Sequence, residues 1–420
     1  MFALRDSAAT ASPPVPDAAT STGLKRSISL PLLVLYGLGT TIGAGIYALT
    51  GAVAEQAGMA APTSFLVAAG LAGLTGLGFA ELAGRYPKAA GEAVFVDVAF
   101  GVRPLTMAVG VGVLASGLVS AATISVAFAG YVGDLVSTPE AVLTVGLLVV
   151  LGVIAAVGVR ESVATAGVIT AIELVGLVLV VWVARDAWSA APARIGELAG
   201  FSGATVAGVA GGAFLAFFAF HGFEDMDSVA EETVNASVTM PRAIIATLII
   251  TTFVYVVVAT TAVLTVPPAD LASSDAPLSL IFERAGGRSE ILSAIAGIAM
   301  VNGVLVQLVM APRIVYGLTR LGLLPAAAGA VSARTGTPVR ATVAAVAAVA
   351  ALALTLELTS LARMASGITM AVFVAVNVSL IVIKRRQGPA RSFSVPAWMP
   401  WLGTAASIAL LVMELGTGIE

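Results

Sequence analysis

The sequence predicts an all-α protein that crosses a membrane many times. Of its 420 residues, 59% are hydrophobic and only 11% are charged, and the mean hydropathy is +1.02. Soluble domains carry about 25% charged residues, and they have no core large enough to hide so many apolar segments. Two of the apolar segments, residues 30–54 and 205–232, are interrupted in the middle by glycine and polar residues.

Eleven segments reach the length of about 20 apolar residues that a membrane-spanning helix requires. They are residues 30–54, 60–84, 104–133, 140–159, 163–184, 205–232, 241–266, 289–318, 339–357, 361–383 and 398–418. Residues 1–29 are rich in Ala, Ser, Thr and Pro and lack the apolar centre of a signal peptide. We therefore expect a disordered cytoplasmic tail over residues 1–29, followed by an uncleaved first span.

The distribution of basic residues predicts the orientation, because Lys and Arg accumulate in cytoplasmic loops. If the N-terminus is inside, sixteen of the 21 Lys and Arg residues fall on the inner side and four on the outer side. The remaining one, Arg363, lies in or at the edge of a span. The sequence thus predicts a cytoplasmic N-terminus and, with eleven spans, an outer C-terminus.

The middle of the first span, residues 37–45, reads GLGTTIGAG. Each glycine in a helix costs about 1 kcal/mol relative to Ala, and unwound backbone at membrane depth must be buried in protein or line a watery cavity. Because the ends of the two half-helices offer free N–H and C=O groups to a charged ligand, we predict a substrate site near Thr41–Gly45. The alternative is close helix packing through the G-x-x-x-G pattern of Gly39 and Gly43.

The sixth span contains the second interruption, at residues 220–222, and an acidic run follows it. Two broken helices five spans apart have opposite orientations, as an inverted repeat of five plus five helices requires. The predicted repeats are residues 30–184 and 205–383, and residues 398–418 form an additional helix. The two breaks would then meet near the middle of the bilayer.

Several kinds of function are excluded or disfavoured by composition. The chain has no cysteine and one histidine, which excludes thiolate and histidine-cluster metal sites, so we expect no metal cofactor and no catalytic residues. No P-loop is present, and a net charge of −3 gives no indication of nucleic acid binding.

Four motifs resemble the amino acid–polyamine–organocation superfamily of permeases over residues 30–386. They are GLGTTIGAGIYALTG in the first span, ELAGRYPKAAGEAVFVDVAFG from Glu81 to Gly101, FFAFHGFEDMDSVAEE from Phe217 to Glu232, and APRIVYGLTRLGLLP from Ala311 to Pro325. The resemblance implies the leucine-transporter fold, built from inverted repeats with discontinuous helices 1 and 6, and transport by alternating access.

The resemblance also implies the substrate contacts. Backbone N–H groups in the first break would bind the substrate carboxylate, and carbonyl groups in the sixth would bind its ammonium, since helix ends favour ions of these signs. The residues at these positions are Thr41, Ile42, Gly43, Ala44 and Gly45 in the first break and Phe218, Ala219, Phe220, His221 and Gly222 in the sixth. Phe223 would act as a side-chain gate.

The chain departs from the family at three points. Glu173 stands in helix five where sodium-independent members often carry lysine, and a charge at this depth costs about 2.5–3.5 kcal/mol. Glu173 would carry a proton or attract Na⁺ or a cationic substrate group; the alternative is a protonated side chain hydrogen-bonded between helices. His221 replaces an aliphatic residue and titrates near neutral pH when unperturbed, although a structural role is the alternative. The family commonly has twelve spans rather than eleven.

Other polar residues have more than one interpretation. Glu224, Asp227, Ser228 and Glu231 share one face of an α-helix, where they would pair with Arg85, Lys88 or Arg160 in an inner gate. The alternative is a solvated helix end. We expect interhelical hydrogen bonds from a further set of polar residues inside the spans, namely Ser116, Thr123, Asn302, Gln307 and Asn377.

These observations predict a secondary amino acid transporter in the plasma (inner) membrane. Neutral amino acids are the favoured substrates, because no second acid inside the membrane is evident besides Glu173. We expect a coupling ion, H⁺ more than Na⁺, and no other cofactor; symport or exchange and the oligomeric state stay open. The alternatives are a cationic amino acid or polyamine permease and a sensor that binds amino acids without transport.

Overall fold

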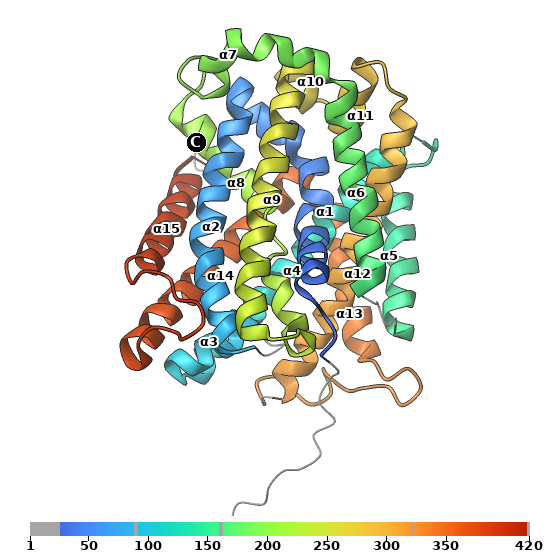
Figure 1. Ribbon diagram of the computed structural model, residues 1–420. Helices are drawn as coiled ribbons and strands as arrows, with labels where there is room; N and C mark the ends of the chain where they lie inside the picture. The colour runs from blue at the N-terminus through green and yellow to red at the C-terminus, as the bar shows by residue number, and fades with distance from the viewer. Residues whose placement is uncertain (1–25, 88–90, 134, 159–162, 321, 418–420) are drawn as a thin grey trace, which may run out of the picture.

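The computed structural model describes residues 26–87, 91–133, 135–158, 163–320 and 322–417. These residues form a bundle of long helices, and their only β-pairing is an isolated bridge between Ile28 and Thr233 (Figure 1). Every span predicted from the sequence contains a helix. These helices are α1 Leu30–Ala57, α2 Ala61–Arg85, α4 Arg103–Gly133, α5 Glu140–Val157, α6 Val163–Val183, α8 Val206–Phe218, α9 Ala236–Thr265, α12 Ser289–Arg320, α13 Val339–Thr355, α14 Leu358–Gln387 and α15 Met399–Thr417.

Shorter helices connect the long ones at both ends of the bundle. They are η1 Gly58–Ala60, α3 Gly91–Phe100, η2 Arg185–Ala190, α7 Ala191–Leu198, η3 Glu224–Glu232, α10 Pro268–Ala272 and α11 Pro277–Arg284. The start of α1 and helix α3 lie at one end, which we call the α3 end, and α7, α10 and α11 lie at the other, the α10 end (Figure 1).

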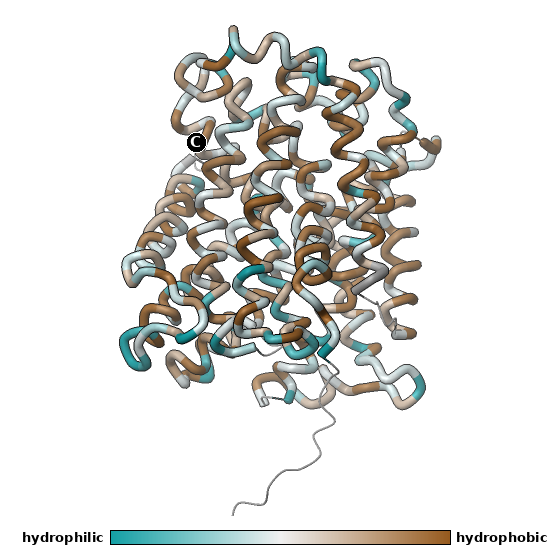
Figure 2. The backbone as a smooth tube through the Cα atoms, viewed as in Figure 1, coloured by the Kyte–Doolittle hydropathy of each residue, from teal (hydrophilic) through white to brown (hydrophobic). Residues whose placement is uncertain are grey.

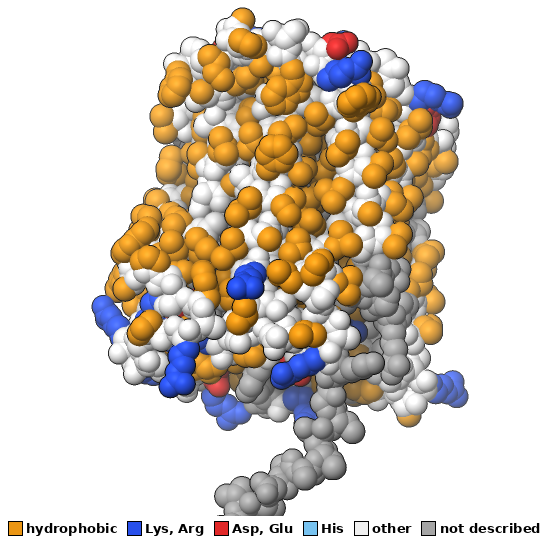
Figure 3. All heavy atoms as spheres, viewed as in Figure 1, with side chains coloured by type: hydrophobic (Ala, Val, Ile, Leu, Met, Phe, Trp, Pro, Cys, Tyr) orange, Lys and Arg blue, Asp and Glu red, His pale blue; other side chains and the backbone are white. Residues whose placement is uncertain are grey.

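The surface has the pattern expected of a multi-pass membrane protein. Within the described residues, eight stretches are long and apolar enough to cross a membrane; one of them, Leu30–Arg85, contains both α1 and α2. Helices α8 and α13 are apolar but shorter. Hydrophobic residues fill the middle of the bundle and polar ones its ends (Figure 2). On the face shown in Figure 3, most Lys and Arg side chains lie toward the α3 end.

Both predicted interruptions are present. Helix α1 leaves helical geometry at Gly43, with φ 13° and ψ −136°. Helix α8 ends at Phe218, and the chain resumes as the 3₁₀-helix η3 after a turn in which Gly222 has φ 110°. The hydroxyl of Thr40 donates to the Gly222 carbonyl at 2.8 Å, so the two breaks are in direct contact, as the sequence predicted.

The predicted tail reaches less far than residue 29. The backbone N–H groups of Ser27 and Ile28 donate to the Glu232 carbonyl at 2.9 and 3.1 Å, and Val234 donates back to Ile28 at 3.0 Å. These bonds fasten the start of α1 to the end of η3. Residues 1–25 of the predicted tail lie outside the described residues.

Each end of the bundle is closed by a different kind of contact. At the α10 end, Gly51 of α1 packs against the Leu271 backbone and Gly130 of α4 against Asp275, at positions where a Cβ atom would overlap. At the α3 end, the buried Glu81 accepts hydrogen bonds from both Arg85 and Lys384, which ties α2 to α14.

Candidate functional site

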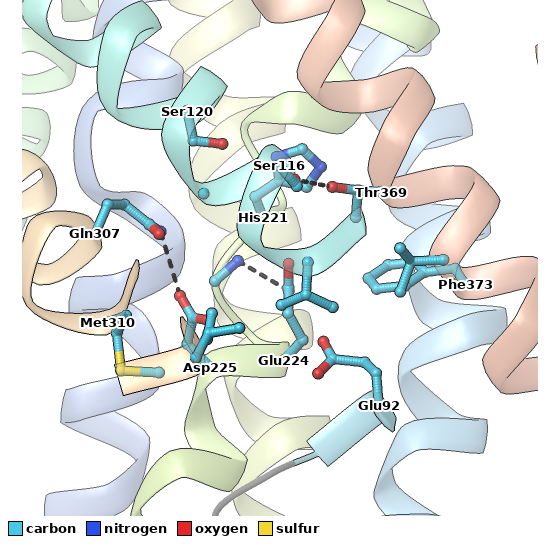
Figure 4. Close-up of a pocket in the computed structure, with 15 residues that line it drawn as sticks. Glu92, Ser116, Ser120, His221, Glu224, Asp225, Gln307, Met310, Thr369 and Phe373 are labelled. Carbon is cyan, nitrogen blue, oxygen red and sulfur yellow. Dashed lines mark hydrogen bonds between the residues drawn. The ribbon is translucent and has the colours of Figure 1, made fainter. Parts of the chain in front are cut away.

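A cavity lies between the two breaks and helices α4, α12 and α14. We call the part that borders the α1 break and Asn302 of α12 the inner part of the cavity. We call the part that extends toward Glu92 of α3 and Phe373 of α14 the outer part (Figure 4). These names do not refer to the two sides of the membrane. Both parts share a set of wall residues, so they adjoin each other. The shared residues are Ser120, His221, Asp225 and Gln307.

Two buried polar groups at the inner part lack a hydrogen-bond partner among the described residues. Thr41 is 2% exposed and its hydroxyl is unpaired; Asn302 is 4% exposed and its Oδ1 is unpaired. Buried polar atoms are nearly always hydrogen-bonded, so unpaired ones that line a cavity indicate the place of a ligand. Gly43, Ala44 and Gly45 line the same wall, and their predicted contact with the substrate carboxylate stays a prediction.

The Tyr255 hydroxyl, on α9, holds the two breaks together from behind the cavity. It lies 2.8 Å from the Thr41 carbonyl, 3.2 Å from that of Ile42 and 2.7 Å from that of Ala219. Ile42 and Ala219 therefore face Tyr255, and neither lines the cavity. The Ala219 carbonyl accepts from Tyr255 in this conformation, and its predicted contact with the substrate ammonium stays a prediction.

The aromatic residues of the sixth break divide into a wall and a core. Phe218 lines the cavity, and its carbonyl accepts from the His221 N–H at 3.1 Å. Phe220 is fully buried, with its ring centroid 5.1 Å from that of Tyr255. Phe223 is buried 5.5 Å from Phe373, which itself lines the cavity. The aromatic side chains at the cavity wall are therefore Phe218 and Phe373, and Phe223 packs behind Phe373; its role as a gate stays a prediction.

His221 points into the outer part of the cavity, near Ser116 and Thr369, whose hydroxyls are hydrogen-bonded to each other (Figure 4). Both ring nitrogens of His221 lack a partner among the described side chains and backbone groups. The ring packs edge-on against those of Phe217 and Phe218, with centroids 5.6 and 5.3 Å away. Its polar atoms are thus free to contact whatever occupies the cavity.

Carboxylates occupy the part of the cavity toward the α3 end. Glu92, Glu224 and Asp225 line it. The Gly222 N–H donates to Glu224 Oε2 at 2.9 Å, and Gln307 Nε2 donates to Asp225 Oδ2 at 3.5 Å (Figure 4). The cavity therefore has the α1 break on one side and carboxylates on the other.

The predicted arrangement of the acidic run is wrong in one respect. Because η3 is a 3₁₀-helix, residues three apart share a face, and Glu224 and Asp227 both point inward. Glu231, seven residues after Glu224, falls on another side and is exposed. The face proposed from α-helical spacing therefore does not form.

The predicted inner ion pair with Arg85 is also wrong. Arg85 binds Glu81 and donates to the Gly388 carbonyl at 2.8 Å. Lys88 and Arg160 lie outside the described residues. Among the residues that the structure describes, no Lys or Arg forms an ion pair with Glu92, Glu224, Asp225 or Asp227.

Glu173 lies on α6, apart from the cavity. It is 0% exposed, and neither carboxylate oxygen has a hydrogen-bond partner in the described part of the chain. Its backbone carbonyl accepts from the Tyr47 hydroxyl at 3.0 Å. The interhelical hydrogen bond considered as the alternative for its side chain is therefore not formed here, and a role in ion coupling stays a prediction.

Several cavity residues were expected only to join helices. Asn377 does make such a bond, to the Thr75 hydroxyl of α2 at 3.1 Å, whereas Thr123 donates within its own helix α4, to the Val119 carbonyl at 2.9 Å. Ser116 and Gln307 also bond to other elements, to Thr369 of α14 and Asp225 of η3, and both line the cavity together with Asn302. The sequence shows that all five are polar residues inside spans, but not which side of each helix faces the breaks.

Comparison with known proteins agrees with this architecture. Residues 28–417 match the family described as Amino acid permease. The branched-chain amino acid permease BcaP of Bacillus subtilis is 28% identical over 94% of this chain and 89% of its own length. Cationic amino acid transporter 4 of human, and the vacuolar cationic amino acid transporter 4 of Arabidopsis thaliana, are each 30% identical, over 91% and 86% of this chain. The chain spans 64% of the length of each of these two.

The match covers nearly the whole chain, and these relatives are named as carriers rather than enzymes. The predicted superfamily is therefore confirmed. This chain is a multi-pass membrane protein that belongs to the amino acid permease family, within the amino acid–polyamine–organocation superfamily.

Proposed function

We propose that this permease carries an amino acid across the plasma membrane by alternating access, with the α3 end toward the cytoplasm. The orientation rests on the excess of Lys and Arg in the loops on that side. The substrate would sit in the cavity between the breaks, with its carboxylate at the N–H groups of Gly43–Gly45 and the Thr41 hydroxyl. Its ammonium would face the carbonyl groups at the end of α8, next to Phe218.

The carboxylates in the cavity favour a substrate with a cationic side chain. The sequence favoured neutral amino acids because a second acid was not evident, but Glu92, Glu224 and Asp225 supply three. Unpaired carboxylates in a confined space attract a cation strongly, since little water screens the charge. This single observation carries the substrate proposal, and the names of the human and Arabidopsis relatives are consistent with it.

A neutral branched-chain amino acid is the second candidate. It is favoured by the similarity to BcaP, which extends over 94% of the chain. An apolar side chain would contact Val113, Val372 and Phe373, which line the outer part of the cavity beside the carboxylates.

Counterflow in proteoliposomes distinguishes the candidates. Vesicles are preloaded with unlabelled L-arginine, L-lysine or L-leucine, and uptake of the same labelled amino acid is measured. We expect exchange of arginine and lysine by the wild type and at least a tenfold loss in Asp225→Asn, consistent with about 1.4 kcal/mol or more per lost charge contact. The matched control is Glu290→Gln, an exposed carboxylate near the α10 end that pairs with Arg288.

The other outcomes are equally informative. Exchange of leucine alone would establish the neutral candidate and refute the cationic one. Binding of an amino acid without counterflow would refute transport and favour the sensor that the sequence left open. Repeating the assay with Na⁺ present and absent tests whether Na⁺ or H⁺ is the coupling ion.

A further inference from the structure

Glu92 approaches the acidic side chains of η3 from a different helix. It is the second residue of α3, it is 8% exposed, and its carboxylate points toward Glu224 across the cavity (Figure 4). Helix α3 follows α2 and packs on α4, α14 and η3. The acids that border the cavity thus come from two elements, α3 and η3, which are far apart in the sequence.

The contact between these elements is close. Gly91 has φ 35°, and a Cβ atom at this position would overlap the Asp227 carboxylate. Asp227 is 7% exposed, and its Oδ2 has no partner among the described groups. The first turn of α3 therefore lies directly on η3, and Gly91, the residue before Glu92, is in contact with Asp227. We call Glu92, Glu224, Asp225 and Asp227 the carboxylate cluster.

The charged and titratable groups around Glu92 come from every element packed on α3. They are Glu224, Asp225, Asp227, Glu231 and Glu232 of η3, His221 in the preceding break, Lys384, Arg385 and Arg386 of α14, Arg103 of α4, and Asp97 of α3 itself; Arg363 of α14 pairs with Glu414. The basic groups contact other partners: Lys384 binds Glu81, and Arg385 lies over the Trp401 ring.

The remaining two cations are likewise directed elsewhere. Arg386 donates to the Ala99 carbonyl at 2.7 Å, two turns along α3 from Glu92. Arg103 lies against Gly322. No described cation is placed to neutralise the carboxylate cluster.

Four neighbouring carboxylates without a cation do not all ionise, because burial and mutual repulsion both favour the protonated form. Burial, and then the charge of Asp225, raise the pKa of Glu92 to about 7. The cluster therefore retains one or more protons at neutral pH, shared among its members rather than fixed on one. The unpaired His221 nitrogens and the unpaired Asn302 oxygen border the same cavity and indicate that a larger ligand also enters it.

We propose that the carboxylate cluster is a site where a proton and the cationic side chain of the substrate bind alternately, with Glu92 as the residue that releases the proton. This inference rests on the proposed transport of cationic amino acids. When the substrate cation enters, it provides the positive charge that the proton supplied, and the proton leaves to the water at the α3 end. Substrate movement in one direction is thereby linked to proton movement in the other.

Proton release on binding tests this inference directly. The purified full-length protein is titrated with L-arginine by calorimetry near pH 7, in two buffers with different enthalpies of ionisation. We expect a net release of roughly one proton per arginine, since one charge replaces another. Glu92→Gln is expected to bind arginine with a clearly smaller release. The matched control, Asp97→Asn on the exposed side of α3, is expected to behave as the wild type does.

A second measurement needs only the wild type. Because protons compete with arginine, the apparent affinity for arginine should fall by up to about tenfold per pH unit as the pH decreases below 7. Arginine binding without proton release and with a constant affinity from pH 5 to 8 would overturn the inference while leaving cationic transport intact. Absence of arginine binding at every pH would instead refute the proposed substrate class.

Discussion

Thr40 and Gly222 join the two broken helices at the centre of the molecule. The Thr40 hydroxyl donates to the Gly222 carbonyl at 2.8 Å, while the Thr40 carbonyl occupies the space that a side chain at residue 222 would need. The residue at 222 must therefore be glycine for two reasons, the close approach and a φ of 110°.

Gly222→Ala is expected to destabilise the protein strongly. The backbone conformation alone costs an L-residue about 1–3 kcal/mol, and the overlap with Thr40 adds to this. The measurement is the melting temperature in detergent, with Gly70→Ala as the control because an added Cβ there meets nothing within 4 Å. Equal melting temperatures for the two variants would show that the contact between the two breaks can open without a loss of stability.

Tyr255→Phe removes the one donor that three carbonyl groups share. Leaving buried carbonyls unpaired costs about 1–3 kcal/mol, so we expect a lower melting temperature and a weaker affinity for substrate. Tyr316→Phe, which alters a partly exposed hydroxyl bound to Arg320, serves as the control and should change stability little. A Tyr255→Phe protein with unchanged stability and affinity would contradict the role assigned to this hydroxyl.

Glu81→Gln is expected to loosen the α3 end. The carboxylate accepts from Arg85 and Lys384 and from the Val395 N–H at 2.7 Å, so its loss leaves two partly buried cations without a counter-charge. Removing one partner of a buried ion pair costs about 3–5 kcal/mol. The exposed pair of Glu197 with Arg194 gives the control, Glu197→Gln, with an expected loss of about 0–1 kcal/mol in denaturation measurements.

Glu173→Gln tests the helix-five carboxylate. If Glu173 carries the coupling ion, the variant should retain exchange but lose the dependence of uptake on a pH or Na⁺ gradient. The readouts are substrate-induced current and the pH inside the vesicles, with and without Na⁺. Transport that is unchanged in every condition would assign Glu173 a structural role only.

Stability should depend on pH through Glu92. Its pKa is raised in the folded protein, so the folded state binds the proton more tightly than the unfolded chain does. The stabilisation is fully present below the ordinary carboxyl pKa and is lost as the pH rises through about 7. We expect the substrate-free protein to melt at a lower temperature at pH 8 than at pH 5.5, and the difference to shrink in Glu92→Gln. An identical difference in wild type and variant would assign the pH dependence to other groups.

The sequence was sufficient to predict the helices and both breaks, because apolar length and glycine content act locally. It did not predict which polar side chains line the cavity. Asn302 and Gln307 face it because of how α12 packs against α4 and α1, which is a property of the whole bundle. The sequence also did not indicate that Glu92 lines the cavity, because Glu92 lies far from the acidic run in the sequence and only the fold brings them together.

The acidic run illustrates a second limit. Its residues were assigned to one face by the 3.6-residue period of an α-helix, whereas the chain after the break adopts the tighter 3₁₀ form. The residues that directly follow a helix break lack the intrahelical hydrogen bonds that fix the 3.6-residue period of an α-helix. Periodicity is therefore least informative next to the breaks, where the ligand contacts occur.

The glycine contacts at the α10 end have a consequence for how the protein responds to its surroundings. Gly51 and Gly130 meet the α10–α11 segment backbone to backbone, and the Leu278 N–H donates to the Tyr131 hydroxyl at 3.1 Å. Contacts of this kind neither titrate near neutral pH nor weaken in salt, whereas the carboxylates at the other end do both. The contacts that close the two ends are thus chemically unequal, so we expect a change of pH or ionic strength to loosen the α3 end more than the glycine contacts at the α10 end.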